Sequence, residues 1–413
     1  MKYIIIIPDG AADRPLKELG GQTPFEAASI PHTDGLCTRR RGRLGTVQTT
    51  PPDFQAGSDI CCMCLLGYSP EKYHTGRAPL EAAALGLDMA PTDWVFRVNL
   101  VTVIDGNMQD HSAGHIRSDE GRQLLTDFAQ HTDLPGMTLH PGVSYRNIMI
   151  DHSATNPSAT CPPRDWTRLV TTPPHEIPDE PIRKYLPAGC RDAKDLHRII
   201  TESQALFAEH DINKTRRELG ELPATHLWPW GQGRIPQLPS FESRFGLRGA
   251  VITAVDLLAG IARYIGWDRL DVPGQTSYHD TDYAAAGRHA IEALDRYDLV
   301  CVHVEAPDEA AHGADAPTKV AALEAIDQHI VAPILQALEQ RGDDDWRILY
   351  LPDHYTLVST RKHDATPVPF VICGKNINSV VQRPFTEHHA DESDLHIAFG
   401  HELMEYFLFS GLS

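Results

Sequence analysis

The chain of 413 residues carries a formal net charge of −19, with 41% hydrophobic and 23% charged residues. This length and composition are typical of a globular protein with a large core and about two domains. The negative charge would repel nucleic acid phosphates and anionic membrane surfaces, so we expect neither as a partner. The sequence leaves the oligomeric state open.

The first apolar run, Tyr3–Ile7, is too short for the core of a signal peptide or for a membrane-spanning helix. The eight cysteines are scattered through a large chain, unlike the dense pattern of a small disulfide-bonded domain. We therefore expect a cytoplasmic protein. The same run is rich in β-branched residues and predicts a buried strand, with Asp9 just beyond its end. A strand-end aspartate can also be no more than a turn or cap residue.

Ser58 lies in a small turn, Gly57-Ser58-Asp59, directly before an apolar segment. At the start of a helix its hydroxyl would lie beside backbone N–H groups that favour an anion, as a nucleophile requires. The alternative is that Ser58 only caps the helix. The cysteines that follow, Cys61, Cys62 and Cys64, could form a soft-metal cluster. We favour small buried helix residues instead, because adjacent cysteines match the usual zinc spacings poorly.

From about residue 71 the sequence becomes rich in Pro, His and Arg, with short strands predicted at Trp94–Val103 and Val143–Met149. Residues 162–187 are predicted to be an irregular connection, and a helix is predicted at Asp195–His210. Guanidinium groups bind carboxylate and phosphate in bidentate fashion, so the arginines of this region could recognise an anion. Each of them, taken singly, can also be an ordinary surface charge, as can the cluster at Arg39–Arg43.

After this region strand and helix patterns alternate. We predict a strand leading into a helix at Gly249–Tyr264, a helix at Ala284–Leu294, a strand at Leu299–Val304 and one long helix at Lys319–Arg341. This alternation predicts an α/β fold, with a mainly parallel sheet flanked by helices and interrupted by a smaller inserted α+β domain. The predicted organisation is a core domain formed by residues 1–70 and 241–413, with residues 71–240 inserted.

Two further strand ends carry metal-ligand residue types. The run Ile348–Leu351 ends in Asp353 and His354, and the strand at 299–304 is followed by Asp308 and His312. The last two are four residues apart, so a helical turn would place them on one face, although such a pair is often a plain surface contact. Because ligands of open α/β sheets collect at the carboxyl ends of the strands, we expect these groups to meet there.

The resulting set holds three carboxylates and three imidazoles, enough for two divalent metal ions. Mixed oxygen and nitrogen ligands suit Mn²⁺, Zn²⁺ or Co²⁺ better than Ca²⁺. A metal could activate a serine hydroxyl as it activates water, and two ions could neutralise a transferring phosphoryl group. The members of the set are Asp9, Ser58, Asp308, His312, Asp353, His354 and His363.

These motifs resemble the alkaline phosphatase superfamily, and more closely the archaeal-type cofactor-independent (2,3-bisphosphoglycerate-independent) phosphoglycerate mutase family. The resemblance covers nearly the whole chain and is specific as a combination of motifs. Segments similar to that family are Pro8–Gly10, Gly57–Asp59, Gly76–Ala82, Asn99–Thr102, Ser112–Ile116, Gly142–Arg146, Trp228–Gly233, His303–Asp308, Asp308–His312, Asp353–His354 and His363 with Pro367–Pro369.

The resemblance implies that Ser58 takes a phosphoryl group from 3-phosphoglycerate to form phosphoserine and returns it to the 2-hydroxyl of glycerate. It implies two divalent ions, with Mn²⁺ first and Zn²⁺, Co²⁺ or Mg²⁺ as alternatives, and no 2,3-bisphosphoglycerate. The ligands implied for one ion are Asp9, Ser58, Asp353 and His354, and for the other Asp308, His312 and His363. The substrate-binding candidates are Arg77, Arg97, Asp110, His115 and Arg146.

Other functions stay open from the sequence. A related transferase such as a homoserine kinase-like enzyme, or a phosphatase, would use the same metal core, and a non-catalytic metal-binding protein is a further alternative. Two positions depart from the family pattern. Less reactive small residues are expected where Cys61, Cys62 and Cys64 lie, and a threonine is more usual at Asp364, which could add negative charge beside the second metal.

Overall fold

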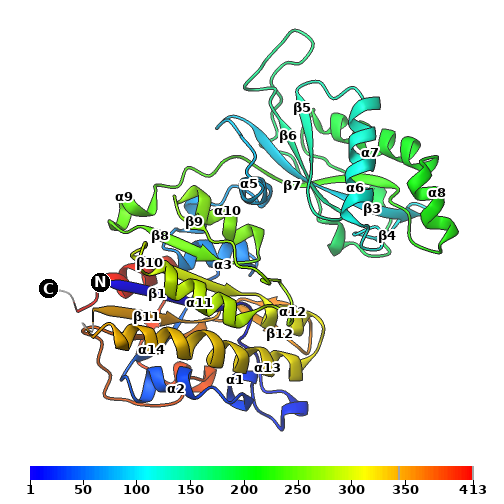
Figure 1. Ribbon diagram of the computed structural model, residues 1–413. Coiled ribbons are helices and arrows are strands. Elements are labelled where there is room, and N and C mark those ends of the chain that lie inside the picture. Colours follow the sequence, from blue (N-terminus) through cyan, green and yellow to red (C-terminus); the bar gives the residue numbers. More distant parts are fainter. Residues whose placement is uncertain (343–344, 412–413) are drawn as a thin grey trace. The chain divides into compact units, whose positions relative to one another are not determined.

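The computed structural model describes residues 1–342 and 345–411. The chain forms two compact units: unit 1 comprises Met1–His74 and Gln237–Ser413, and unit 2 comprises Thr75–Pro236. Figure 1 shows unit 2 as a continuous stretch between two parts of unit 1 along the sequence. Within the described ranges, no helix combines the length and apolar character that crossing a bilayer requires.

Unit 1 is built on an eight-stranded sheet with the order β15-β2-β14-β11-β1-β10-β8-β9. All neighbouring strands are parallel except the two pairs that include β14, which confirms the predicted mainly parallel sheet. The strands are β1 (Lys2–Pro8), β2 (Arg43–Val47), β8 (Gly249–Ile252), β9 (Asp268–Arg269), β10 (Leu299–Val304), β11 (Trp346–Tyr350), β14 (Val368–Gly374) and β15 (His396–Ile397). A separate hairpin joins β12 (Tyr355–Leu357) to β13 (Lys362–Asp364).

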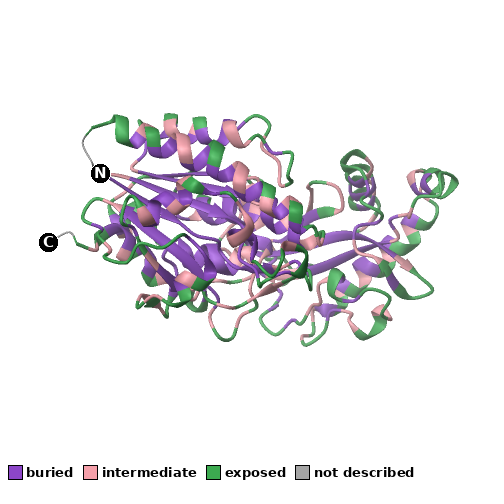
Figure 2. Cartoon of the chain, turned by 90° about the horizontal axis from the view of Figure 1, so that it is seen from below, coloured by how far each residue is buried: buried purple, intermediate pink, exposed green. Residues whose placement is uncertain are grey.

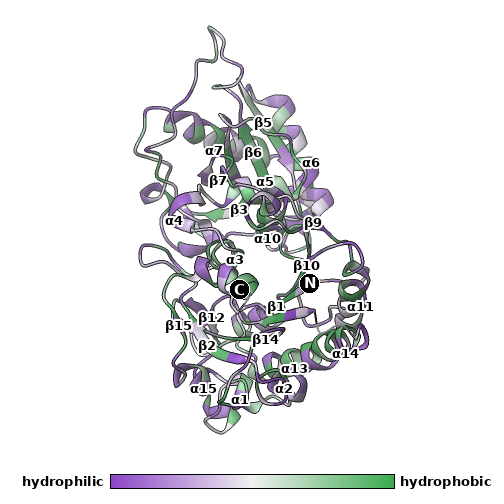
Figure 3. Ribbon diagram, turned by 90° about the vertical axis from the view of Figure 1, so that its left-hand side faces the viewer, coloured by the Kyte–Doolittle hydropathy of each residue, from purple (hydrophilic) through white to green (hydrophobic). Residues whose placement is uncertain are grey.

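The central strands consist mostly of apolar residues, as expected for strands that helices cover (Figure 3). Every residue of β10 is buried, and Figure 2 shows buried strands between helices whose outer faces are exposed. The helices of unit 1 are α1 (Pro24–Ala27), α2 (Pro31–Thr38), α3 (Ser58–Leu65), α4 (Pro70–Tyr73), α9 (Phe241–Phe245), α10 (Asp256–Tyr264), α11 (Tyr283–Ala293), α12 (Ala306–His312), α13 (Ala316–Ile326), α14 (Ala332–Gln340), α15 (Glu387–Asp391) and α16 (Leu403–Phe409). Short 3-10 turns lie at η1 (Lys17–Leu19) and η5 (Gly400–Glu402).

The long helix predicted at Lys319–Arg341 is not a single α-helix. Between α13 and α14 the backbone widens into a π-helical segment, η4 (Asp327–Val331). Pro333 lies in the first turn of α14 and has no N–H to offer the carbonyl of His329, so the regular α-helical bond is lost there. That carbonyl lies close to the Cα of Gly287 on α11, where a side chain would not fit.

Unit 2 contains an antiparallel sheet in the order β4-β3-β6-β5, with β7 also paired to β3. The predicted strand near residue 143 starts later, because the carbonyl of Val143 bonds to the N–H of Arg146 in a turn. The elements are β3 (Trp94–Ile104), β4 (Asn107–Asp110), β5 (Met137–Pro141), β6 (Arg146–Asp151), β7 (His226–Gly233), α5 (Ala78–Ala84), α6 (Ser118–His131), α7 (Ala193–Ala208), α8 (Asp211–Glu218), η2 (Pro174–Glu176) and η3 (Ile182–Lys184).

Candidate functional site

The register of the sheet in unit 1 places Asp9 at the centre of its C-terminal edge. In β1, Pro8 lies opposite Val304 of β10, and Ile6 lies opposite Tyr350 of β11. Asp9 therefore leaves the sheet between the strand ends that lead to Asp308 and Asp353. The next residue, Gly10, has φ +57°, and a Cβ there would collide with the side chain of Asp308. The turn after β1 thus requires glycine so that the carboxylates can approach each other.

Asp9 and Asp353 share one buried group with His354. The Nε2 atom of His354 lies 3.4 Å from Asp9 Oδ1 and 3.4 Å from Asp353 Oδ2. Asp353 Oδ1 accepts hydrogen bonds from the backbone N–H groups of Gly10 (3.1 Å) and His354 (3.0 Å). These bonds fix the carboxylate so that Oδ2 is the oxygen left for the group. All three side chains are fully buried.

Asp308 forms a second group with His312 and His363. His312 Nε2 lies 3.2 Å from Asp308 Oδ2, so the pair four residues apart on α12 is in contact, as the sequence spacing predicts. His363 comes from β13 and brings its Nε2 to 3.5 Å from Asp308 Oδ1. Its ring stacks on His354 with a centroid distance of 4.1 Å. This stacking joins the second group to the first.

Ser58 is the first residue of α3 and lies beside Asp9. Its hydroxyl donates to Asp9 Oδ2 at 3.4 Å. The alternative in which Ser58 only caps the helix is wrong, because Gly57 occupies the N-cap position. Ser58 is partly exposed, whereas Asp9 is fully buried. A hydroxyl in this place can be reached by a substrate and activated by the group behind it.

The imidazoles of these two groups point the same ring nitrogen inward. Nδ1 of His312 contacts the carbonyl of Arg361 (3.0 Å), and Nδ1 of His363 contacts the carbonyl of Ala56 (3.1 Å). A carbonyl can only accept, so Nδ1 carries the proton and Nε2 offers a lone pair in the neutral ring. Ligating histidines are usually oriented by such a bond to the other nitrogen.

The donor set fits divalent metal ions. Among the residues that the structure describes, Asp9 Oδ1 and His354 Nε2 are buried atoms that have no hydrogen-bond partner. Such atoms are costly to leave unsatisfied, and an ion would satisfy both. In the described ranges three sets of three ligand atoms, each within 4.8 Å of one another, could hold an ion, and two of these sets consist only of residues predicted from the sequence. These two sets are Asp9 with Asp353 and His354, and Asp308 with His354 and His363.

In the absence of an ion, the pKa values of these side chains are shifted because the carboxylates lie close together. Burial and the neighbouring charge of Asp353 raise the pKa of Asp9 well above its usual value. Burial would also raise the pKa of Asp308, but hydrogen bonds from His312 and His363 hold it well below its usual value. The hydrogen bond to Asp308 in turn raises the pKa of His312 to about 9. The group therefore holds protons where bound cations would relieve the same repulsion.

Three residues of this region were not assigned to the site from the sequence. His303 lies in β10, and its Nε2 is 3.1 Å from Asp9 Oδ2. Thr356 donates to Asp308 Oδ1 and contacts Nδ1 of His354. Cys62 points its Sγ at Asp353 Oδ2, 3.5 Å away. A histidine inside a buried strand was a signal available in the sequence, since polar residues are rare there.

The other two cysteines do not join Cys62. Cys61 contacts the hydroxyl of Thr50 instead, and Cys64 lies against Gly400. The prediction of small buried helix residues is confirmed, since Cys61, Cys62 and Cys64 are all buried. The eight cysteines, all within the described ranges, are free of disulfides.

Asp364 is turned away from the metal-ligand candidates. Its Oδ1 accepts from the backbone N–H of Thr366 at 2.9 Å and lies 3.8 Å from a guanidinium nitrogen of Arg14. The bond from the Thr366 side chain is the main cause that lowers the pKa of Asp364. Its charge is therefore balanced by its own turn and by Arg14.

Unit 2 gathers cationic side chains around one carboxylate. Glu81 of α5 pairs with Arg77 (3.0 Å) and with Arg97 of β3 (3.0 Å). Arg97 is buried, and its guanidinium lies over the ring of Trp230, 4.4 Å from the centroid. Burial lowers the pKa of Arg97 to about 10, and the positive charges of Arg77 and Arg146 add to this against Glu81. Arg146 itself is exposed and lies over Tyr145.

Two histidines, whose lowered pKa values favour the neutral ring, lie beside this cationic group. The ring of His175 packs edge-on against Trp230 (5.4 Å) and against His111 (6.0 Å). Desolvation and the charge of Arg77 lower the pKa of His175, and desolvation is also the main cause that lowers the pKa of His111. Neither histidine was a candidate from the sequence: His175 lies in η2, within the proline-rich stretch that we predicted to be irregular, and His111 directly follows β4.

Asp110 and His115 occupy the same loop with different roles. Asp110 Oδ1 accepts from the N–H and hydroxyl of Ser112 and from the N–H of Gly114. These bonds lower the pKa of Asp110 against the effect of burial and hold the loop closed. His115 is exposed with φ +50° and lies 6.3 Å from the ring of Tyr145. His115 therefore belongs to the rim of the cationic group, and Asp110 supports it.

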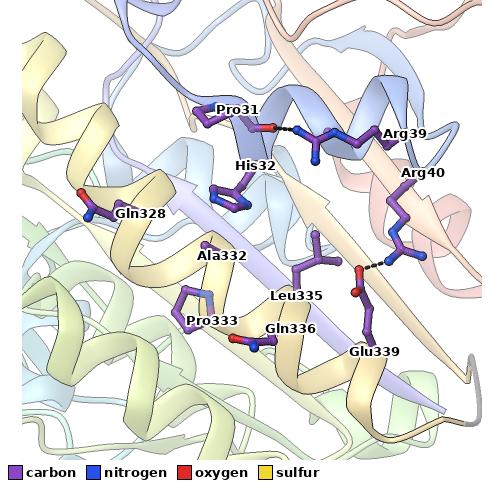
Figure 4. A pocket seen from close by; sticks show the side chains of 11 residues that line it. Pro31, His32, Arg39, Arg40, Gln328, Ala332, Pro333, Leu335, Gln336 and Glu339 are labelled. Carbon is purple, nitrogen blue, oxygen red and sulfur yellow. Dashed lines mark hydrogen bonds and ion pairs between the residues drawn. The ribbon is translucent and has the colours of Figure 1, made fainter.

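A pocket elsewhere on unit 1 contains none of the candidate residues. It has a volume of about 560 Å³ and lies between α2 and α14 (Figure 4). Its arginines are already engaged: Arg39 donates to the carbonyl of Pro31 and Arg40 pairs with Glu339. This agrees with the interpretation of the Arg39–Arg43 cluster as a surface feature.

Comparisons with known proteins agree with the geometry. A family model described as 2,3-bisphosphoglycerate-independent phosphoglycerate mutase matches residues 40–213. A protein of that name from Methanothrix thermoacetophila is 43% identical over 98% of this chain and 98% of its own. A second, from Methanothermobacter thermautotrophicus, is 39% identical over 98% of this chain and 96% of its own.

Solved structures are similar over the whole chain as well. A protein from Pyrococcus horikoshii is 27% identical with a TM-score of 0.81, covering 98% of this chain and 96% of its own. A cofactor-independent phosphoglycerate mutase from Thermoplasma acidophilum is 25% identical with a TM-score of 0.64, covering 99% of both chains. The likeness therefore includes both units of the molecule.

Proposed function

Because the chain belongs to the family of 2,3-bisphosphoglycerate-independent phosphoglycerate mutases, we propose that it interconverts 3-phosphoglycerate and 2-phosphoglycerate through a phosphorylated Ser58. The observation that carries this proposal is the position of the Ser58 hydroxyl, partly exposed and 3.4 Å from Asp9 Oδ2. A nucleophile beside a buried set of metal-ligand side chains is what phosphoryl transfer requires. Eight cysteines that form no disulfide fit the cytoplasmic location that we also propose.

We assign two divalent ions to this group of side chains. Asp9, Ser58, Asp353 and His354 would hold one ion, and Asp308, His312 and His363 the other. The orphaned Asp9 Oδ1 and His354 Nε2 support the first assignment. When bound, the ions would lower the pKa of the Ser58 hydroxyl and offset charge on the phosphoryl oxygens. We propose Mn²⁺ first, with Zn²⁺, Co²⁺ or Mg²⁺ as alternatives.

The chain's own residues perform two transfers. Ser58 Oγ forms a bond to phosphorus while the bond between phosphorus and the 3-oxygen of the substrate breaks. Asp9 Oδ2 is the acceptor nearest to the hydroxyl proton. The 3-oxygen of the released glycerate takes up a proton as it leaves. The glycerate then turns, its 2-hydroxyl loses a proton as its oxygen attacks phosphorus, and Ser58 Oγ regains a proton as its bond to phosphorus breaks, which restores the enzyme. No 2,3-bisphosphoglycerate is needed, since Ser58 carries the phosphoryl group between the two hydroxyls.

The cationic group of unit 2 would hold the anionic substrate. Arg77, Arg97 and Arg146 present guanidinium groups, of which Arg146 has the most exposed position. Guanidinium binds carboxylate and phosphate through paired N–H donors. Retention of glycerate between the two transfers is the chemical requirement that separates a mutase from a phosphatase, because escape of glycerate leaves only water as the acceptor.

A phosphorus NMR assay of the purified chain tests this function. We expect 2-phosphoglycerate to form from 3-phosphoglycerate with Mn²⁺ and without added 2,3-bisphosphoglycerate. EDTA should abolish the reaction, and excess Mn²⁺ should restore it. Parallel reactions offer homoserine with ATP, and 3-phosphoglycerate with a search for free phosphate. Phosphorylation of homoserine alone would replace the mutase by a kinase-like transferase, and release of phosphate alone would replace it by a phosphatase.

A further inference from the structure

We propose a third ion site in unit 1, formed by Cys62, His303 and Asp353, that takes a thiophilic divalent ion such as Zn²⁺ or Cd²⁺. The three ligand atoms lie within 4.8 Å of one another, and all three residues are buried. The site is distinct from the two-ion assignment above because two of its three ligands take no part in that assignment. Its existence does not rest on mutase activity.

Cys62 supplies the soft ligand. It follows Ser58 by four residues on α3, so both side chains project from the same face of that helix. Its Sγ lies 3.5 Å from Asp353 Oδ2. Sulfur binds metals as thiolate, so binding breaks the S–H bond, forms a bond from sulfur to the ion and releases one proton to solvent. Thiolate selects Zn²⁺ and similar soft ions over Mg²⁺ and Mn²⁺.

His303 supplies an imidazole that takes no part in the two-ion assignment. Its Nδ1 contacts the hydroxyl of Thr253 at 3.2 Å, and that hydroxyl also accepts from the N–H of Val255 at 3.0 Å. This orients the ring so that Nε2 points at the carboxylates. Within residues 1–342 and 345–411, Nε2 of His303 is a buried atom that makes no hydrogen bond, although it lies 3.1 Å from Asp9 Oδ2. A ring held through one nitrogen with the other left open is the usual arrangement of a metal ligand.

Asp353 links the proposed site to the two-ion assignment. Its Oδ1 is occupied by two backbone N–H groups, so Oδ2 is the oxygen that both sites would use. Occupation of the third site therefore competes for a ligand of the ion beside Ser58. A consequence, which rests on the proposed function, is that Zn²⁺ or Cd²⁺ inhibits the Mn²⁺-dependent reaction and that Cys62→Ser relieves the inhibition.

Cobalt spectroscopy of the full chain tests the site without any activity measurement. Co²⁺ is added to the metal-free protein in a non-thiol reductant, and the near-ultraviolet charge-transfer band of a cobalt–thiolate bond is recorded. We expect the band in the unmodified chain and in Cys61→Ser, whose sulfur faces Thr50 instead, and its loss in Cys62→Ser. The absence of the band from the unmodified chain, or its survival in Cys62→Ser, would show that Cys62 is only a hydrogen-bond donor to Asp353.

A second measurement needs no cysteine variant and so does not depend on the folding of one. The ¹¹³Cd chemical shift of the cadmium-loaded chain distinguishes a ligand set with sulfur from one of oxygen and nitrogen alone. A sulfur-containing set supports the site, and an oxygen and nitrogen set refutes it. His303→Asn should weaken Cd²⁺ binding by at least about tenfold. Unchanged Cd²⁺ affinity in this variant would remove His303 from the site.

Discussion

Two regions of the molecule gather charged side chains in opposite ways. The metal-ligand group of unit 1 is buried and leaves Asp9 Oδ1 and His354 Nε2 without hydrogen-bond partners among the described residues. The cationic group of unit 2 instead pairs Arg77 and Arg97 with Glu81 and keeps Arg146 exposed. Inward lone pairs without hydrogen bonds call for a cation, whereas partnered and exposed guanidinium groups suit an anion that exchanges with water.

Burial of charge by itself does not mark a binding site in this protein. Lys319 and Asp13 are as buried as Asp9 and form an ion pair at 3.0 Å. Glu387 beside them accepts from the N–H of Asp13 (3.1 Å) and from the hydroxyl of Thr23 (2.7 Å). These buried groups are satisfied by one another, so we interpret them as structural. They differ from the metal-ligand group in having hydrogen-bond and ion-pair partners, and not in how deeply they are buried.

The largest effect is expected from Ser58→Ala. Loss of the nucleophile removes both transfers, so kcat should fall by at least about 10⁴-fold. Mn²⁺ binding, measured by calorimetry, should persist because the buried ligands remain. Retention of most of the activity in this variant would exclude a phosphoserine mechanism.

Asp308→Asn should weaken binding of the second ion. The change removes a buried carboxylate that His312 and His363 both contact, and we expect Mn²⁺ affinity to fall by about 100-fold in equilibrium dialysis. Asp364→Asn is the matched control, since Asp364 neighbours His363 in sequence but pairs with Arg14. Equal losses in the two variants would contradict the distinction that we draw between these carboxylates.

Arg146→Met should affect substrate binding more than chemistry. Arg146 is exposed beside the buried Arg97, so its removal leaves the fold intact while it deletes a charged donor. We expect KM for 3-phosphoglycerate to rise about tenfold to 100-fold, with kcat changed far less. Arg122→Met, an exposed change on α6, should leave both constants unaltered. A pure kcat effect would assign Arg146 a role in the reaction itself.

The smallest effect concerns stability and Glu387. Burial raises the pKa of this carboxyl from 4.5 to about 7, although Thr23 and Asp13 oppose the shift. A raised folded pKa contributes stability that is fully present below pH 4.5 and is lost as the pH rises through 7. The shift corresponds to at most about 3 kcal/mol. Between pH 5 and pH 8 the free energy of unfolding should therefore change by about 1 to 3 kcal/mol less in Glu387→Gln than in the unmodified chain.

Urea unfolding in EDTA measures this dependence without a contribution from bound metal. Glu392→Gln, at the exposed end of the same helix, should keep the pH profile of the unmodified chain. If Glu387→Gln also keeps that profile, Glu387 is already ionised at pH 5 in the folded protein.

The sequence predicted much of the framework on which the site is built. Runs of β-branched residues identify β1, β10 and β11, and the residue types at their ends identify Asp9, Asp308 and Asp353 as candidates. The spacing of Asp308 and His312 predicts their contact, since residues four apart share a helix face. The long helix predicted at Lys319–Arg341 is present, but its π-helical segment, η4, was not predicted, because the pattern of apolar residues does not reveal that Pro333 leaves the carbonyl of His329 without its α-helical bond.

What the sequence determined by itself were local properties: which segments are strands, which residues end them and which side chains of one helix share a face. Only the tertiary structure decided which atoms from distant segments meet. His303 reaches Asp9 and Cys62 reaches Asp353 across neighbouring elements, whereas Asp364 turns from His363 toward Arg14. Strand register, helix rotation and hydrogen-bond competition set these encounters, and none of them is encoded in the spacing of residues along one segment.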